Sequence, residues 1–247
     1  MKKHIPNLLT LCNLLCGCLA VFFAVNDFLT YAAYMVIVGL VFDFLDGFAA
    51  RILKVESPIG KQLDSLADVV TFGLAPAFVM MQLLYYTQYI SYGCFVFDSS
   101  IYNIEAVYDG VFFPLIGLLI ALASAYRLAK FNVDTRQTDS FIGLPTPANA
   151  LWIICLPMIP SEWTFLLLTN TWVLIGLTLL SCYLLTANIP MFALKFKKRS
   201  YKENQLQYNF IVLSIILLIF LQFAAVPLII GLYVLVSLLF SRKQKII

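Results

Sequence analysis

Residues 43–68 read DFLDGFAARILKVESPIGKQLDSLAD, and this acidic stretch interrupts an otherwise strongly apolar sequence. Asp43 and Asp46 are one helical turn apart, and Asp64 and Asp68 are one turn apart further along the chain. A proline and a short polar run separate the two pairs, which predicts two helices joined as a hairpin. Because a carboxylate near hydrocarbon is costly, four of them together indicate a functional site.

Such a hairpin would bring the four carboxylates together near one face of a membrane, where they would repel one another. Hard divalent cations bound through oxygen ligands are the usual remedy for that repulsion. The alternative is that these acids merely solvate a loop. Their helical spacing within apolar segments argues against that alternative.

The pattern D-x2-D-G-x2-A-R-x8-G-x3-D-x3-D resembles the signature of the CDP-alcohol phosphotransferases, integral membrane enzymes of phospholipid synthesis. The chain matches all eight fixed positions, which are Asp43, Asp46, Gly47, Ala50, Arg51, Gly60, Asp64 and Asp68. The resemblance implies two divalent cations, Mg²⁺ or Mn²⁺, held by Asp43, Asp46, Asp64 and Asp68. It also implies that Asp68 acts as the general base for an attacking alcohol.

The composition indicates a membrane protein, because 62% of the 247 residues are hydrophobic and only 12% are charged. Soluble domains average about 25% charged residues. We predict an all-α, polytopic integral membrane bundle that forms a single domain over residues 1–247. A span needs about 20 apolar residues. Eight spans are predicted, at about residues 5–25, 29–53, 60–86, 111–131, 148–159, 163–187, 208–224 and 226–240.

The distribution of charge predicts the orientation of these spans. With the N-terminus inside, all 16 Lys and Arg residues fall in inside segments, whereas the outside loops carry only acids. Positive charge is enriched on the cytoplasmic side of membrane proteins. We therefore expect a protein of the cell's inner or plasma membrane, with both termini and the acidic site at the cytoplasmic face. No feature indicates a nucleic-acid partner.

The resemblance also implies residues that bind the CDP-lipid. Small residues at Gly47, Ala50 and Gly60 would let a nucleotide approach two helix backbones, although they serve close helix packing equally well. Arg51 would hold a phosphate or pin the acidic cluster, unless it only anchors the inner interface. Asn7, in a stretch similar to the family's opening segment, would approach the pyrophosphate. The alternative for that stretch is a simple proline-initiated helix start.

Two later stretches bear on the acceptor alcohol. SAYRLAKFN at residues 124–132 and GLPTPA at residues 143–148 resemble sequences of the CDP-diacylglycerol–serine O-phosphatidyltransferases. This similarity implies L-serine as the acceptor, bound by Arg127, Lys130 and Asn132. Lys130 stands where those enzymes have arginine and loses bidentate geometry. The alternative is that both cations only mark the inner interface. The resemblance covers roughly residues 4–150, and family members form homodimers.

Three other functions are compatible with parts of this pattern. Glycerol phosphate or inositol phosphate could replace serine in the same reaction, although a second phosphate would want several basic groups around it. A cation transporter could also use intramembrane carboxylates, but its polar residues should extend across the bilayer. A membrane scaffold without catalytic activity would not require the fixed spacing of the acids.

Overall fold

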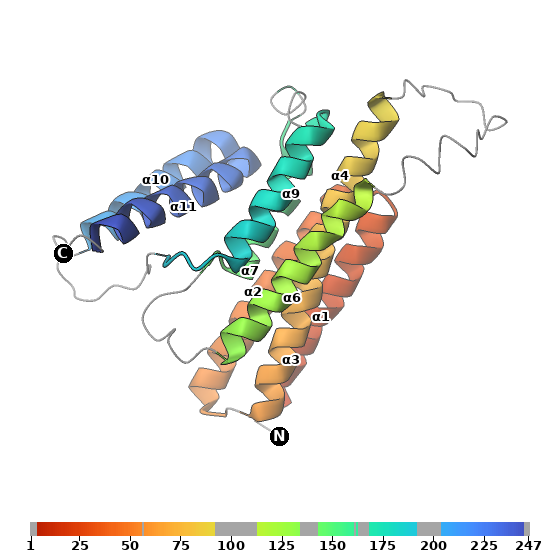
Figure 1. Ribbon diagram of the computed structural model, residues 1–247. Coiled ribbons are helices and arrows are strands. Elements are labelled where there is room, and N and C mark those ends of the chain that lie inside the picture. The colour runs from red at the N-terminus through yellow and green to blue at the C-terminus, as the bar shows by residue number, and fades with distance from the viewer. Residues whose placement is uncertain are drawn as a thin grey trace.

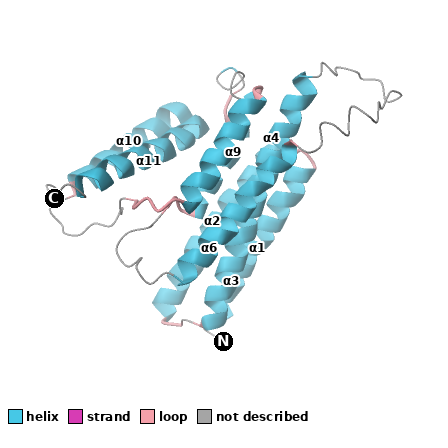
Figure 2. Ribbon diagram, in the orientation of Figure 1, coloured by secondary structure: helices cyan, strands magenta, loops and turns pink. Residues whose placement is uncertain are grey.

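The computed structural model describes residues 4–55, 57–91, 113–133, 143–160, 162, 168–191 and 204–244. Within these residues every regular element is a helix, as Figure 2 shows, so the prediction of an all-α fold is confirmed for them. The first two helices are α1 (His4–Val25) and α2 (Leu29–Leu53), which pack side by side (Figure 1). Together with the helix that follows, they form one end of the bundle near the N-terminus.

The turn after α2 contains residues that end this helix and residues that begin the next one. Lys54 adopts the left-handed conformation with φ 52°, and the Val55 N–H donates to the Ala50 carbonyl at 3.1 Å, which closes the helix. Ser57 then caps α3 (Pro58–Asp68), because its hydroxyl oxygen accepts the Gly60 N–H at 2.9 Å. These local signals produce the hairpin that the sequence predicts.

After this turn the chain forms one continuous helical rod, which runs from α3 to Ser91. α3 continues into a π-helical segment, Val69–Leu74, and then into α4 (Ala75–Ser91). The sequence predicts one span here, at residues 60–86, and the rod covers it. The π-helical segment, which begins directly after Asp68, was not predicted. Such segments are rare and often occur at functional sites.

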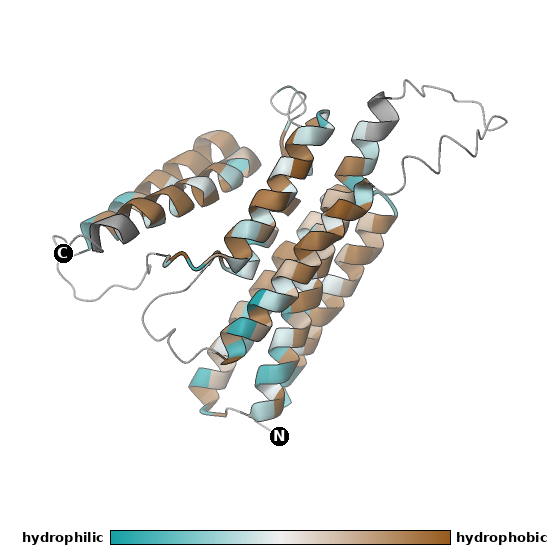
Figure 3. Ribbon diagram, in the orientation of Figure 1, coloured by the Kyte–Doolittle hydropathy of each residue, from teal (hydrophilic) through white to brown (hydrophobic). Residues whose placement is uncertain are grey.

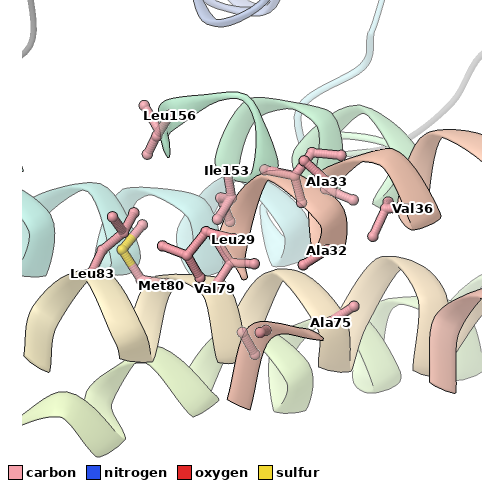
Figure 4. Packing of buried hydrophobic residues seen from close by; sticks show 14 of the residues in the cluster. Leu29, Ala32, Ala33, Val36, Ala75, Val79, Met80, Leu83, Ile153 and Leu156 are labelled. Atoms are coloured by element: carbon pink, nitrogen blue, oxygen red, sulfur yellow. The ribbon is translucent and has the colours of Figure 1, made fainter. Parts of the chain in front are cut away.

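The core between these helices is built from small residues. Ala32 and Ala33 of α2 and Ala75 of α4 are fully buried, and Figure 4 shows them beside the larger side chains of Val36 and Met80. Small side chains let helix backbones approach closely, which is how helices pack in lipid. This close approach holds α1, α2 and the α3–α4 rod together around the acidic stretch.

Three further helices complete the main bundle. A short 3₁₀ segment, Pro114–Leu118, leads into α6 (Leu119–Val133), and α9 is Thr171–Thr186. Between them lies α7 (Thr146–Ile154), which continues as a 3₁₀ turn to Met158. The predicted span at 148–159 is therefore a short helix. At 1.5 Å per residue it falls well below the length that crosses a bilayer.

The C-terminal helices form a separate hairpin beside the bundle (Figure 1). α10 (Gln205–Leu221) and α11 (Ala225–Gln244) are joined by a 3₁₀ turn that begins at Gln222, where φ is 49°. The break predicted between residues 224 and 226 is confirmed to within a few residues, and Pro227 lies in the first turn of α11, where proline is tolerated. Ile230 of α11 packs into a small apolar cluster that attaches the hairpin to the bundle.

Four helical stretches among the described residues are long and apolar enough to cross a membrane by length and composition: His4–Val25, Pro58–Thr87, Pro114–Val133 and Gln205–Leu239. The last of these includes both helices of the C-terminal hairpin. α2, with 25 residues, is also long enough to cross a membrane, but it contains Asp43, Asp46 and Arg51 of the acidic stretch. Part of the predicted span at 163–187 lies outside the described residues. The number of spans therefore stays a prediction.

Candidate active site

Three of the four predicted acids meet at one point of the hairpin. Asp43 projects from α2, and Asp64 and Asp68 project from α3. One carboxylate oxygen of each lies within 4.8 Å of the others. Asp43 and Asp64 are half-buried, whereas Asp68 is 9% exposed. Helical spacing puts Asp64 and Asp68 on one face of α3, and the turn at Lys54 brings Asp43 opposite them.

The chemistry of this group fits a hard divalent cation. Two unit charges 4 Å apart repel by roughly 4 kcal/mol at an effective dielectric constant of about 20. Three ionised carboxylates at such separations would therefore destabilise the hairpin unless a cation neutralised them. Carboxylate oxygens are the ligands that Mg²⁺ and Mn²⁺ prefer. Asp43, Asp64 and Asp68 thus form a donor set that suits the predicted cofactor.

Asp46 has a different environment from the other three acids. Its Oδ2 accepts a hydrogen bond from the Thr10 hydroxyl of α1 at 2.6 Å, and the residue is only 6% exposed. Asp46 is therefore attached to α1 and does not belong to the group of three whose oxygens lie within 4.8 Å. Thr10 was not singled out from the sequence. The only signal for it was a polar side chain within an apolar span.

The predicted CDP-lipid residues lie around the same end of the hairpin. Gly60 of α3 faces Asn7 of α1, and a Cβ atom built on Gly60 would lie 3.0 Å from the Asn7 Oδ1. A Cβ atom built on Gly47 would meet nothing within 4 Å, so close helix packing does not explain that glycine. Ala50 is half-buried. The Arg51 Nε donates to the Gly47 carbonyl of its own helix at 3.0 Å.

A cavity of about 460 Å³ lies between the beginnings of α1 and α3. Its lining is mostly apolar and consists of His4, Ile5, Asn7, Leu8, Leu11 and Leu63. Asn7 thus borders both this cavity and the neighbourhood of Gly60.

The three predicted acceptor residues on α6 make three different contacts. An Arg127 terminal nitrogen donates to the Thr146 hydroxyl at 3.1 Å, the Lys130 ammonium donates to Asn188 Oδ1 at 2.7 Å, and the Asn132 amide donates to Ser65 Oγ at 2.8 Å. Asn132 therefore reaches α3 next to Asp64, whereas Arg127 contacts the start of α7 and Lys130 contacts the segment that follows α9.

Arg127 has the most unusual environment of these residues. It is only 7% exposed, and its Nε has no hydrogen-bond partner among the residues that the structure describes. Asp68 of α3 and Tyr233 of α11 are the groups whose ionised forms its positive charge attracts. Because an unpaired buried donor is costly, the environment of Arg127 suits a ligand that accepts from Nε. No functional residue was predicted after position 150, so Tyr233 was not identified from the sequence.

Figure 3 shows how polarity is distributed over the bundle. Hydrophilic residues gather along α3 and at the ends of α2 and α6 that lie near the N-terminus, while the rest of α2 and α6 is mostly apolar. Asp43, Asp64 and Asp68 belong to this polar end. This one-sided distribution agrees with a site that opens at one membrane face.

Comparisons with known proteins agree with this site. The family description CDP-alcohol phosphatidyltransferase matches residues 3–180. A CDP-diacylglycerol–serine O-phosphatidyltransferase of Bacillus subtilis (strain 168) is 32% identical over 158 residues, which cover 62% of this chain and 75% of that protein. Proteins of the same name from Helicobacter pylori (strain J99) and Methanocaldococcus jannaschii are 30% and 32% identical.

These two matches cover 74% and 72% of this chain, and 70% and 71% of the respective relatives. The family match ends at residue 180, before α10 and α11 begin. It includes the whole acidic hairpin, α6 and α7. The chain is a helical membrane protein that belongs to the CDP-alcohol phosphatidyltransferase family.

Proposed function

We propose that this chain transfers the phosphatidyl group of CDP-diacylglycerol to L-serine, which yields phosphatidylserine and CMP. The observation that carries the proposal is the convergence of Asp43, Asp64 and Asp68 within a fully matched family signature. The choice of serine is supported by the three relatives reported above, all of which are named CDP-diacylglycerol–serine O-phosphatidyltransferase. The buried Arg127, whose charge is attracted to Asp68, supports it independently.

The reaction is a single displacement at phosphorus. The serine hydroxyl oxygen forms a bond to the phosphorus that carries the diacylglycerol, the bond from that phosphorus to CMP breaks, and CMP leaves. We assign Asp68 as the general base that takes the hydroxyl proton, because it is the most buried member of the acidic group. When bound, two divalent cations neutralise charge on the pyrophosphate. Asp43, Asp46, Asp64 and Asp68 would hold them.

The CDP-lipid would occupy the polar end of the hairpin. The open space beside Gly47 and the small side chain of Ala50 would leave room for the nucleotide, and the absence of a side chain at Gly60 lets Asn7 approach α3 closely. Asn7 would approach the pyrophosphate from α1, and Arg51 would bind a phosphate after releasing its contact with its own helix. The diacylglycerol chains remain in the membrane lipid.

Arg127 is the residue we expect to bind the carboxylate of serine. Its Nε is unpaired and buried, so a carboxylate could accept from it, while a terminal nitrogen stays bonded to Thr146. Asn132 lies beside Ser65, next to Asp64 in sequence, and would border the same pocket. Lys130, which contacts Asn188, would contribute only through long-range attraction.

Replacing Arg127 by glutamine should therefore weaken serine binding specifically. Losing a hydrogen-bonded charge costs about 1.5–3 kcal/mol, which raises the KM for serine about 10- to 100-fold. The KM for CDP-diacylglycerol should change little. The matched control is Lys61→Gln, which removes an exposed cation from α3 at the same end of the bundle. Equal increases of both KM values in Arg127→Gln would contradict the assignment.

The identity of the acceptor can be measured directly. Purified protein is incubated with CDP-diacylglycerol, a divalent cation and one acceptor at a time, and CMP release is recorded. We expect release with L-serine and none with glycerol phosphate or inositol phosphate. Release with glycerol phosphate alone would make the serine assignment wrong while preserving the reaction class. Absence of CMP release with every acceptor would favour a cation transporter.

We also propose the arrangement of the protein in the membrane. The charge distribution supports both termini and the acidic group facing the cytoplasm of the cell, because an eight-segment topology would place every Lys and Arg on the inner side. In that topology the short α7 would cross only together with the residues that flank it. Cytosolic serine and metal could then reach the site directly. We further propose a homodimer, as the family resemblance implies. Labelling of single cysteines from either side of the membrane tests the orientation.

A further inference from the structure

Asn13 contacts the proposed base from a neighbouring helix. Asn13 lies in the middle of α1 and is fully buried, and its Nδ2 donates to the Asp68 Oδ1 at 3.3 Å. Because the Asn13 amide is uncharged, this hydrogen bond brings no opposite charge to the Asp68 carboxylate. The contact engages one of the two carboxylate oxygens of Asp68.

The backbone of Asn13 is itself held in place. Its carbonyl accepts a hydrogen bond from the Thr71 hydroxyl at 3.0 Å. Thr71 is fully buried in the π-helical segment that begins directly after Asp68. The same rod therefore supplies both Asp68 and the group that anchors its partner. The π-helical segment turns Thr71 toward α1, because it shifts the register of the residues that follow Asp68.

Two glycines allow α1 and α2 to approach this point. A Cβ atom on Gly39 would lie 2.7 Å from the Thr71 Cγ2 and 3.0 Å from the Asn13 Oδ1, and one on Gly17 would collide with the Thr71 hydroxyl. The Asn13 Oδ1 lies near Gly39 and has no hydrogen-bond partner in the described part of the chain. A flipped amide would point this oxygen at the Asp68 carboxylate, so the electrostatics favour the orientation with Nδ2 toward Asp68.

We propose that Asn13, held by Thr71, is a positioning residue that sets the orientation of the Asp68 carboxylate for proton abstraction. The terminal torsion of aspartate is soft, so an unanchored carboxylate samples a broad range of orientations. A misplacement of about 1 Å can cost about 10²-fold in rate. The inference rests on the proposed function, because it assigns Asn13 a part in that reaction.

The primary test is Asn13→Leu, which keeps a similar volume and removes the donor. We expect kcat for CMP release to fall about 10²-fold, while the KM for CDP-diacylglycerol and the affinity for CMP measured by titration stay unchanged. A purely structural role would lower binding and thermal stability together with kcat. Unchanged kcat, or a parallel loss of CMP binding, would overturn the proposal.

Thr71 provides a second, independent test that does not alter Asn13. Thr71→Val removes the hydroxyl that holds Asn13, whereas Thr71→Ser retains it, so we expect the serine variant to keep much more of kcat. Thr178→Val is the matched control. Thr178 is equally buried in α9, and its hydroxyl bonds only the Leu174 carbonyl of its own helix at 2.8 Å. Equal kcat in Thr71→Val and Thr71→Ser would contradict the proposed anchor.

A double-mutant cycle decides the outcome if Asn13→Leu is unstable. Because Thr71 acts through Asn13, Thr71→Val should add little to a less drastic change such as Asn13→Ser. Additive losses would mean that the two residues act separately and would overturn the inference. Failure of the unmodified protein to release CMP with any acceptor would instead refute the proposed function, so the two failures are distinguishable.

Discussion

Replacement of Asp68 by asparagine should lower the rate of CMP release roughly 10²–10⁴-fold, the usual contribution of a general base. Asparagine has nearly the same shape, and its oxygen can still accept the hydrogen bond from the Asn13 Nδ2. It cannot accept the proton of the serine hydroxyl. Binding of CDP-diacylglycerol should persist, because the other acids remain. The two measurements are steady-state CMP release and equilibrium binding of the CDP-lipid.

The matched control for this variant is Asp27→Asn. Asp27 lies in the turn between α1 and α2 at the opposite end of these helices, where its Oδ1 accepts from Gln82 at 3.5 Å. Its φ of 69° is a conformation that asparagine adopts readily. This control should therefore retain activity and stability. Full activity in Asp68→Asn would refute the assigned role of Asp68.

Removal of divalent cations should abolish CMP release, and added Mn²⁺ or Mg²⁺ should restore it. The physical reason is the mutual repulsion of Asp43, Asp64 and Asp68 and of the substrate pyrophosphate. Binding should also be visible without turnover. A cation that binds only the folded protein raises its thermal stability, so Mn²⁺ should raise the Tm of the unmodified protein.

The same experiment on Asp43→Asn should show a much smaller rise of the Tm, because one of the three close ligands loses its charge. Asp27→Asn should behave like the unmodified protein. Turnover that survives exhaustive chelation would show that the acidic group has another function. A Tm that rises equally in Asp43→Asn would exclude Asp43 as a ligand.

The location of the acidic group in a hairpin was predictable because its determinants are local. The four-residue interval between Asp64 and Asp68 places both on one face of any α-helix. Ser57, Pro58 and the residues before them end one helix and begin the next. The family match, predicted from the eight fixed positions, is confirmed.

The position of the later apolar helices was more predictable than whether each one crosses the membrane. The sequence predicts a span at 148–159, and α7 with its 3₁₀ extension covers Thr146–Met158, but a helix of this length is too short to cross a bilayer. Hydropathy measures apolar content, and a short helix buried among other helices is as apolar as one that faces lipid. Burial of α7 beside α2 and α4 depends on the packing of the whole bundle.

By itself, the sequence determined that this protein is a helical membrane protein with an acidic, metal-suited hairpin, since hydropathy and helical periodicity act over a few residues. Only the tertiary structure decided that Asp46 is bonded to Thr10, that Asp68 is bonded to Asn13, and that Arg127 lies against Thr146. These pairs are 36, 55 and 19 residues apart in sequence. Such contacts depend on which helices become neighbours and on where glycines allow close approach. That information belongs to the packing of several helices together.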